Sequence, residues 1–195
     1  MMPKGTMVLW FNTYYADFPN LFFSMITYLG DGLVIPLVAV VMLWFRYSFF
    51  GTVAFMGITQ LLVVQGLKRY VFGPIERPAA YFSDAMPPLN FVEGVDIHNL
   101  FAMPSGHTAT AFSVAFILVL LLKPGKFVTI LLFLLASLVG LSRIYLAQHF
   151  LVDTLIGCAI GLLLAYGSYF VFMKLEKRYP GAGFFTKSLK KTGAN

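Results

Sequence analysis

The stretch SRIYLAQHFLVD (142–153) contains a histidine and an aspartate with the spacing of a nucleophile and the group that orients it. His149 and Asp153 are four residues apart, so on a helix they share a face about one turn apart. A carboxylate bound to one ring nitrogen fixes the tautomer and leaves the other nitrogen free to act as a nucleophile or a base. Arg143 can direct its guanidinium to the same point. Taken alone, the pattern also fits an interfacial histidine followed by an aspartate that caps a helix.

The stretch PSGHT (104–108) indicates the start of a helix that can hold an anion. Ser105 is a natural N-cap, and Gly106 lets a ligand approach the backbone closely. The free amide groups at a helix N-terminus attract anions through their geometry and the helix dipole. His107, in the first turn, can donate a proton to a leaving oxygen. The alternative is an ordinary cap at a membrane boundary.

A third stretch, KRYVFGPIERP (68–78), adds the cations Lys68, Arg69 and Arg77. Arginine makes planar, two-pronged contacts with phosphate oxygens, and lysine acts as a mobile point charge. Snorkelling from a helix end accounts for Lys68 and Arg69, but it explains Arg77, fixed before a proline, less well. The three stretches together predict one site with basic groups around an anion, two histidines and a carboxylate.

The composition indicates that these stretches lie at the ends of membrane helices. Of the 195 residues, 59% are hydrophobic and only 11% are charged, whereas soluble domains have about 25% charged residues. We therefore predict an all-α fold, a polytopic membrane helix bundle. Spans need about 20 apolar residues, and five segments approach this: 33–45, 52–67, 107–122, 127–141 and 151–173. The net charge of +6 is not gathered on a soluble face, so no nucleic-acid partner is expected.

The first 30 residues are expected to form an N-terminal interfacial amphipathic segment, because aromatic and polar residues alternate there and Pro19 interrupts them. A sixth span is the alternative. Residues 31–175 are then the membrane domain, with an outer loop at 68–104, and residues 176–195 are a basic tail. In the last span, Gly157 and Gly161 are spaced to let that helix pack closely.

The distribution of charge predicts the topology. Five spans place residues 46–51, the turn at 123–126 and the tail on one side of the membrane. Nine of the 14 basic residues lie on that side: Arg46, Lys123, Lys126, Lys174, Lys177, Arg178, Lys187, Lys190 and Lys191. The positive-inside rule makes this side, and the C-terminus, cytoplasmic. The three stretches with the candidate site residues then meet on the outer face.

These stretches resemble the type 2 phosphatidic acid phosphatase superfamily, whose pattern is Lys-x6-Arg-Pro, Pro-Ser-Gly-His and Ser-Arg-x5-His-x3-Asp. Residues 104–107 match the second motif, and Ser142 to Asp153 match the third in full. The first motif is longer here, with eight residues between Lys68 and Arg77. We interpret the extra residues as an insertion that leaves Lys68 in the family's lysine position. Arg69 is the possible substitute for Lys68 in that position.

The resemblance implies a lipid phosphatase that works through a phosphohistidine without a metal or other cofactor. His149 would attack phosphorus, Asp153 would orient it, and His107 would protonate the leaving group. The phosphate oxygens would be held by a larger set: Lys68, Arg77, Ser105, Gly106 and Arg143.

A site at headgroup level suits a lipid phosphate whose tail stays in the bilayer. The expected substrate is undecaprenyl pyrophosphate or a glycerophospholipid such as phosphatidylglycerophosphate or phosphatidic acid. The expected location is the bacterial inner membrane, with the site facing the periplasm or outer side. The alternatives are a lipid A phosphatase, a lipid phosphotransferase, a non-catalytic lipid-binding protein and an anion transporter. The sequence makes no prediction of oligomeric state.

Overall fold

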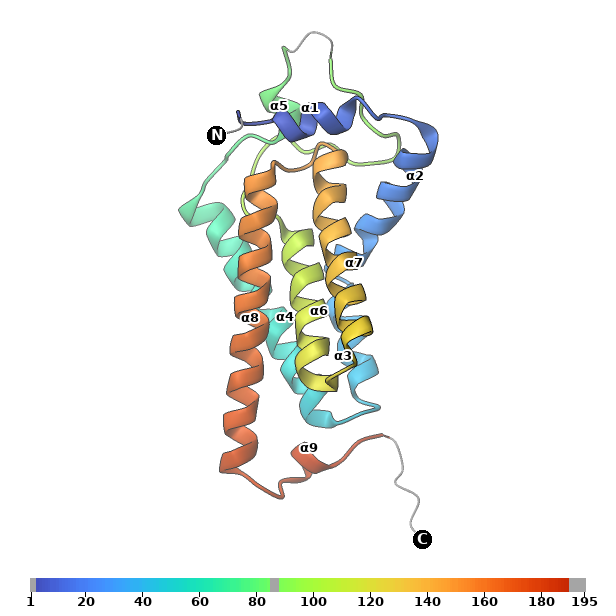
Figure 1. The fold of residues 1–195 in the computed structure, drawn as a ribbon. Helices are drawn as coiled ribbons and strands as arrows, with labels where there is room; N and C mark the ends of the chain where they lie inside the picture. Colours follow the sequence, from blue (N-terminus) through green and yellow to red (C-terminus); the bar gives the residue numbers. More distant parts are fainter. Residues whose placement is uncertain (1–2, 85–87, 190–195) are drawn as a thin grey trace.

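A computed structural model describes residues 3–84 and 88–189, and these residues form an all-α bundle without strands, as predicted. Five roughly parallel helices build the bundle (Figure 1). They are α3 (Val34–Met42), α4 (Tyr47–Gly66), α6 (Gly106–Leu122), α7 (Lys126–Tyr145) and α8 (Leu151–Arg178). The central helix is α6, which contacts each of the other four.

Three helices in the described residues are long and apolar enough to cross a membrane: Tyr47–Val71, Lys126–Tyr145 and Leu151–Arg178. A fourth span results if Asp17–Gly30 and Val34–Met42, which are bent by 54°, count as one. The apolar helix α6 has 17 residues, slightly fewer than the roughly 20 that a full crossing needs. The observed boundaries of α4, α6, α7 and α8 lie close to those predicted, although α4 begins five residues earlier and α8 ends five residues later.

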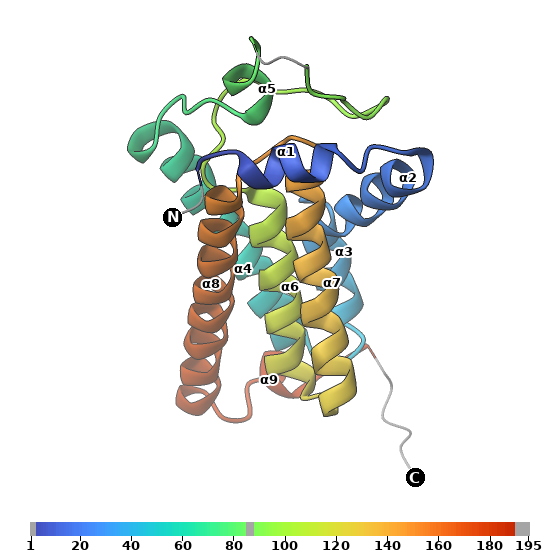
Figure 2. The same ribbon diagram turned by 45° about the horizontal axis from the view of Figure 1, so that its top comes forward.

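The first 30 residues form two helices that differ in orientation. The short helix α1 (Thr6–Asn12) lies across the end of the bundle, and α2 (Asp17–Ile26) runs down beside α7 (Figure 2). A 3₁₀ turn, η1 (Thr27–Gly30), connects α2 to α3. The expected span at 33–45 is therefore short, because α3 ends at Met42 and the continuous path is broken before it. The interfacial role of residues 1–30 and the other domain boundaries stay predictions.

Glycines on α8 let it approach α6 closely, as the sequence predicted. A Cβ atom added at Gly157 would lie 2.5 Å from the Ser105 carbonyl oxygen, and one at Gly161 would collide with the Ala109 carbonyl. Atoms at these distances overlap, so any larger residue forces the helices apart. The first turns of α6 and α8, which contain the second and third motifs, are consequently held against each other.

The outer loop folds back over this end of the bundle. After α4 the chain forms a π-helical turn, η2 (Leu67–Val71), and then the short helix α5 (Pro78–Tyr81). The Arg77 amide donates to the Asn99 carbonyl at 2.8 Å, and the Ala102 amide donates to the Ile75 carbonyl at 3.1 Å. The two arms of the loop are thus joined near the bundle. Residues 85–87, in the loop, and 190–195, in the predicted tail, lie outside the described residues.

Candidate active site

Ser105 caps α6 as the sequence predicted, and it also connects α6 to α8. Its hydroxyl oxygen accepts hydrogen bonds from the Thr108 amide at 3.4 Å and from the Thr108 hydroxyl at 2.9 Å. Its backbone amide donates to the Asp153 carbonyl at 3.0 Å. Gly106 and His107 follow as the first two residues of α6, so the start of this helix lies beside the start of α8.

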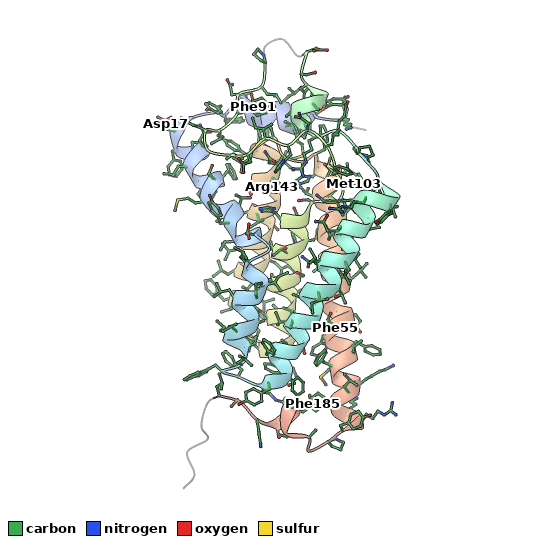
Figure 3. All side chains as sticks on the ribbon, turned by 180° about the vertical axis from the view of Figure 1, so that it is seen from behind. Asp17, Phe55, Phe91, Met103, Arg143 and Phe185 are labelled. Carbon is green, nitrogen blue, oxygen red and sulfur yellow. The ribbon has the colours of Figure 1, made fainter. Side chains whose placement is uncertain are left out.

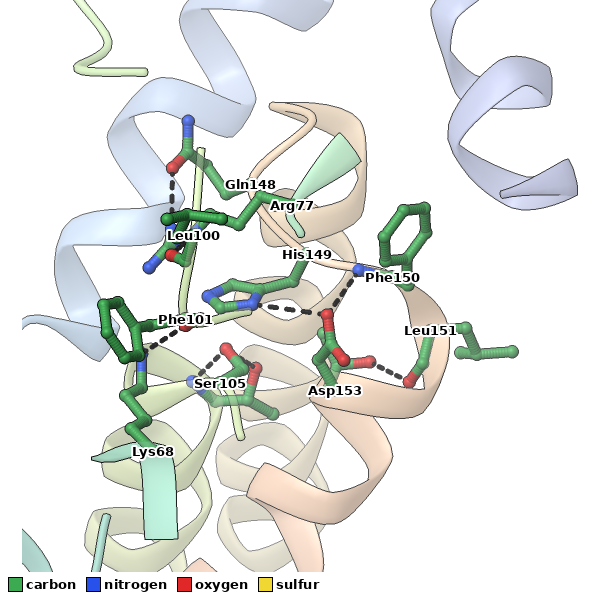
Figure 4. Close-up of polar contacts among 12 residues, drawn as sticks. Lys68, Arg77, Leu100, Phe101, Ser105, Gln148, His149, Phe150, Leu151 and Asp153 are labelled. Carbon is green, nitrogen blue, oxygen red and sulfur yellow. Dashed lines mark hydrogen bonds and ion pairs between the residues drawn. The ribbon is translucent and has the colours of Figure 1, made fainter. Parts of the chain in front are cut away.

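His149 and Asp153 face each other in a buried pair. Nδ1 of His149 lies 3.6 Å from Oδ2 of Asp153, and the two side chains are 2% and 1% exposed. The same carboxylate oxygen accepts the Phe150 amide at 2.9 Å, which fixes its orientation at the start of α8. In Figure 4 the imidazole ring lies between Arg77 and Ser105, with one nitrogen turned to Asp153. The predicted pairing of these two residues on one turn is therefore present.

The charge state of His149 is set by burial and by nearby cations. Burial lowers the pKa of His149 well below 6.5, and Arg77, Arg143, Lys68 and His107 lower it further. The imidazole is therefore neutral near pH 7, with a lone pair available on one nitrogen. A neutral, oriented imidazole surrounded by cations can attack an electrophile that carries negative charge.

A tight turn between α7 and α8 places His149. The amides of Gln148 and His149 both donate to the Arg143 carbonyl, at 2.9 and 3.1 Å. Ala147, inside this turn, has a φ of 52°, a left-handed conformation that costs a residue with a Cβ about 1–2 kcal/mol. The chain adopts this conformation just before Gln148 and His149, the next two residues, which both belong to the site.

Arg77 is buried above the histidine and is held by oxygen acceptors. Nε donates to the Leu100 carbonyl at 2.9 Å, and Nη1 donates to Oε1 of Gln148 at 3.2 Å. Burial is the main cause that lowers the pKa of Arg77, and Asp153 opposes this effect. The guanidinium still has donors that these two contacts do not use, so it can bind an anion as well.

Arg143 extends from the last turn of α7 into the same region. It is 7% exposed, and Nη1 donates to the Thr27 hydroxyl at 2.9 Å. Its Nε atom is buried without a hydrogen-bond partner among the described residues. An unpaired, buried donor is unfavourable unless a ligand satisfies it, which makes this atom a candidate contact for an anion.

Lys68 and Arg69 differ in how they relate to the site. Nζ of Lys68 donates to the Phe101 carbonyl at 3.2 Å, and Figure 4 shows the side chain approaching Ser105 and His149. Lys68 is among the charges that lower the pKa of His149, and Arg69 is not. Both residues line a cavity of about 480 Å³ together with Arg77. The π turn holds roughly one more residue per turn than an α-helix, so it takes up part of the longer spacing between Lys68 and Arg77.

Sequence reasoning missed two polar residues of this site. Gln148 accepts from Arg77 and donates to the Asp96 carbonyl at 3.1 Å, so it bridges the α7–α8 turn and the outer loop. In the sequence, only its position next to His149 indicated that Gln148 belongs to the site. Thr27, the partner of Arg143, comes from η1 and had no signal, because it lies 116 residues away in sequence.

The described residues contain no group of three or more His, Cys, Asp or Glu arranged to hold a metal ion. The absence of a cofactor stays a prediction.

Comparisons with known proteins agree with these motifs. Residues 49–177 match the family model of the PAP2 superfamily. Over 72 residues the chain is 44% identical to phosphatidylglycerophosphatase B of Bacillus subtilis (strain 168), covering 33% of this chain and 36% of that protein. Over 78 residues it is 35% identical to lipid A 4'-phosphatase of Porphyromonas gingivalis, covering 40% of this chain and 33% of that protein. The matched region is thus about a third of the length of these curated relatives.

Two solved structures have a similar fold over most of the chain. The crystal structure of Aquifex aeolicus LpxE superposes with a TM-score of 0.72 at 27% identity, covering 86% of this chain and 95% of that one. The crystal structure of a transmembrane PAP2-type phosphatidylglycerolphosphate phosphatase from Bacillus subtilis superposes with a TM-score of 0.66 at 25% identity. It covers 91% of this chain and 86% of that one.

Proposed function

Because this chain belongs to the PAP2 superfamily, we propose that it is a membrane lipid phosphatase that releases phosphate through a phosphohistidine. The observation that carries the proposal is the buried, neutral His149, paired with Asp153 and surrounded by Lys68, Arg77 and Arg143. Phosphoryl transfer needs mainly positioning and stabilisation of charge, and this arrangement supplies both.

In the first step, the free nitrogen of His149 attacks phosphorus and the bond from phosphorus to the leaving oxygen breaks. His107, which takes up a proton when the negatively charged phosphate binds beside it, gives that proton to the leaving oxygen. The positive charge that develops on His149 is stabilised by Asp153. The released lipid alcohol, or lipid monophosphate, leaves with its tail in the bilayer.

In the second step, water attacks the phosphohistidine. His107, now neutral, takes a proton from that water, the bond between phosphorus and nitrogen breaks, and inorganic phosphate leaves. The phosphate oxygens are held in both steps by the cations and by the α6 start, that is by Lys68, Arg77, Arg143, Ser105 and the Gly106 amide. Lys68 takes the lysine role in preference to Arg69, because its Nζ is bound to Phe101 at the site. This scheme needs no metal.

The substrate in this proposal is a lipid phosphate: phosphatidylglycerophosphate, phosphatidic acid or undecaprenyl pyrophosphate. The names of the relatives, a phosphatidylglycerophosphatase and a lipid A 4'-phosphatase, support the class. Lipid A phosphate is the second candidate because of the similarity to the lipid A 4'-phosphatase of Porphyromonas gingivalis. The proposed location is the bacterial inner membrane, with the site facing outward.

Phosphate release from a panel of lipid phosphates in detergent with EDTA tests the proposal. The wild type should release phosphate from at least one lipid, and His149→Ala should release none while its thermal unfolding stays close to wild type. Acid-labile phosphate bound to the protein during turnover should also be absent from this variant. Release that depends on a divalent metal, or that survives in the variant, contradicts the phosphohistidine scheme.

A further inference from the structure

A second cavity opens from the site between α3, α4 and α6. It has a volume of about 370 Å³, and its walls include Gly106, His107, Ile35, Val64, Gln60 and Thr110. Ile58 and Leu61, at its rim on α4, are 63% and 62% exposed. Figure 3 shows the face of the molecule that α3 and α4 form. Because exposed apolar residues on a membrane helix face acyl chains, the cavity connects His107 laterally with the hydrocarbon of the bilayer.

Gln60 is a polar side chain in this apolar cavity. It is 5% exposed, and its Nε2 donates to the Thr110 hydroxyl at 2.9 Å. Its other amide atom, Oε1, is buried without a hydrogen-bond partner among the described residues. A hydrogen bond between α4 and α6 uses only one end of the amide. A purely structural role therefore leaves the unpaired oxygen unexplained, since a buried polar atom without a partner is unfavourable.

The depth of Gln60 matches the part of a lipid that follows the phosphate. Thr110, its partner, is three residues after His107 on α6, which is about 4.5 Å along the helix axis. When the phosphate lies at His149 and His107, the atoms that reach this depth are only a few bonds from phosphorus. In acylated glycerol and sugar phosphates these atoms include ester, hydroxyl or amide groups. In a polyprenyl phosphate they are hydrocarbon.

We propose that Gln60 is a specificity-determining residue that hydrogen-bonds the polar backbone of an acylated lipid phosphate, so that such lipids are preferred over polyprenyl phosphates. This inference rests on the proposed phosphatase function and narrows its substrate class. The amide can serve either kind of group: Oε1 accepts from a hydroxyl or an amide N–H, and after a half turn Nε2 donates to an ester carbonyl while Thr110 donates to Oε1. A polyprenyl chain satisfies neither end.

The test compares two phosphate monoesters, dioctanoyl phosphatidic acid and farnesyl phosphate, in the same detergent. Gln60→Met keeps the length of the side chain and removes its hydrogen bonds. We expect kcat/KM for phosphatidic acid to fall about tenfold, as for the loss of one buried hydrogen bond, and kcat/KM for farnesyl phosphate to stay within about twofold of wild type. Thr59→Val is the control. Thr59 is on the same helix, and its hydroxyl is bound to the Phe55 and Met56 carbonyls. Its replacement should change neither of the two kcat/KM values.

A second variant tests whether lipids enter the cavity. Gly32 lines it, and a Cβ added there would meet no atom within 4 Å, so Gly32→Leu is chosen to add bulk at the cavity wall. It should lower kcat/KM for both substrates. An equal loss on both substrates in Gln60→Met, no loss on either, or no effect of Gly32→Leu would each overturn the proposal.

A binding measurement separates this inference from the proposed function. In the His149→Ala background, dioctanoyl phosphatidic acid should raise Tm more than farnesyl phosphate does, and adding Gln60→Met should remove the difference. If the wild type hydrolyses neither lipid, the phosphatase proposal fails for these substrates, and the Tm comparison still decides the role of Gln60. If the two lipids raise Tm equally, with or without Gln60→Met, the proposed role of Gln60 is overturned.

Discussion

His149 is kept neutral by its surroundings, and this has consequences for both activity and stability. The folded protein holds the pKa of His149 well below 6.5 because the ring is buried beside Arg77, Arg143 and Lys68. In the unfolded chain the same ring has an ordinary pKa near 6.5. At the scale of a residue, the proposed nucleophile is therefore kept neutral at the expense of stability in acid.

The pH dependence follows from this depressed pKa. Below pH 6.5 the unfolded chain binds a proton that the folded protein does not, so the free energy of unfolding falls as the pH decreases and is fully restored above 6.5. We expect Tm to fall between about pH 7 and about pH 5 more steeply in wild type than in His149→Gln. In kinetics, the protonation of His149 should reduce kcat/KM only well below pH 6.5. An acid limb centred at 6.5 and assigned to this residue by isotope-edited NMR would contradict the prediction.

Asp153→Asn should lower catalysis strongly while leaving folding almost unchanged. The amide oxygen can still accept the Phe150 amide, which Oδ2 of the carboxylate accepts at 2.9 Å, so Tm should change little. The charge that stabilises the developing imidazolium is lost, and kcat should fall about 10³–10⁴-fold, as when the aspartate of a catalytic triad is replaced. Asp17→Asn, at the exposed start of α2, is the matched control and should keep full activity. Activity within tenfold of wild type in Asp153→Asn would exclude the proposed role.

At the scale of elements, the site depends on the contact between the first turns of α6 and α8. Ser105 joins them through its amide hydrogen bond to Asp153, and Gly157 allows the approach. The start of α6 and the pair formed by His149 and Asp153 are therefore held against each other.

Gly157→Ala tests this contact. Its Cβ would lie 2.5 Å from the Ser105 carbonyl oxygen, so we expect a loss of about 1–3 kcal/mol of stability together with lower phosphatase activity. Gly167→Ala, further along the same helix and free of any atom within 4 Å, is the control. It should be neutral or slightly stabilising because alanine is the better helix former. Thermal unfolding in detergent and phosphate release measure the two effects, and equal behaviour of the variants would refute the packing argument.

The sequence predicted those features of the site that depend on residues close together in the chain. The cap at Ser105, the pairing of His149 with Asp153 and the close packing at Gly157 all follow from spacing within one helix or turn. The partners that join distant segments were not predictable, because nothing local marks Thr27 as the neighbour of Arg143. The break between α2 and α3 lies near residue 30, where the sequence analysis ended the N-terminal segment, but the bend of 54° has no local signal because an apolar run does not reveal where a helix bends. The proposed choice of Lys68 over Arg69 rests on the contact between Nζ and the Phe101 carbonyl, which spacing alone does not indicate.

At the scale of the whole molecule, the site residues gather at one end of the bundle, and the other described basic residues, apart from Lys4 and Arg69, lie at the opposite end. Arg46 pairs with Glu176 at 2.7 Å at that other end, and it also donates to the Phe185 carbonyl in the segment that follows α8. The predicted topology, in which the site end faces outward, rests on this distribution of charge and stays a prediction.

Labelling with a membrane-impermeant maleimide tests this topology. In a Cys158→Ala background, which removes the single cysteine of the chain, Ser83→Cys in the outer loop should be labelled in intact cells. Lys177→Cys, at the end of α8, should be labelled only after the membrane is permeabilised. The reverse pattern would invert the assignment of sides and leave the catalytic scheme unaffected.

The hydrogen bonds that hold Arg77 affect which mutations the outer loop can tolerate. Its side chain is bound to the Leu100 carbonyl and its amide to the Asn99 carbonyl, and main-chain oxygens are present whatever side chains the loop has. Mutations at those positions can therefore accumulate without displacing the arginine, provided that the loop keeps its backbone path. A lineage can in this way change the side chains of the loop while Arg77 keeps its position beside His149.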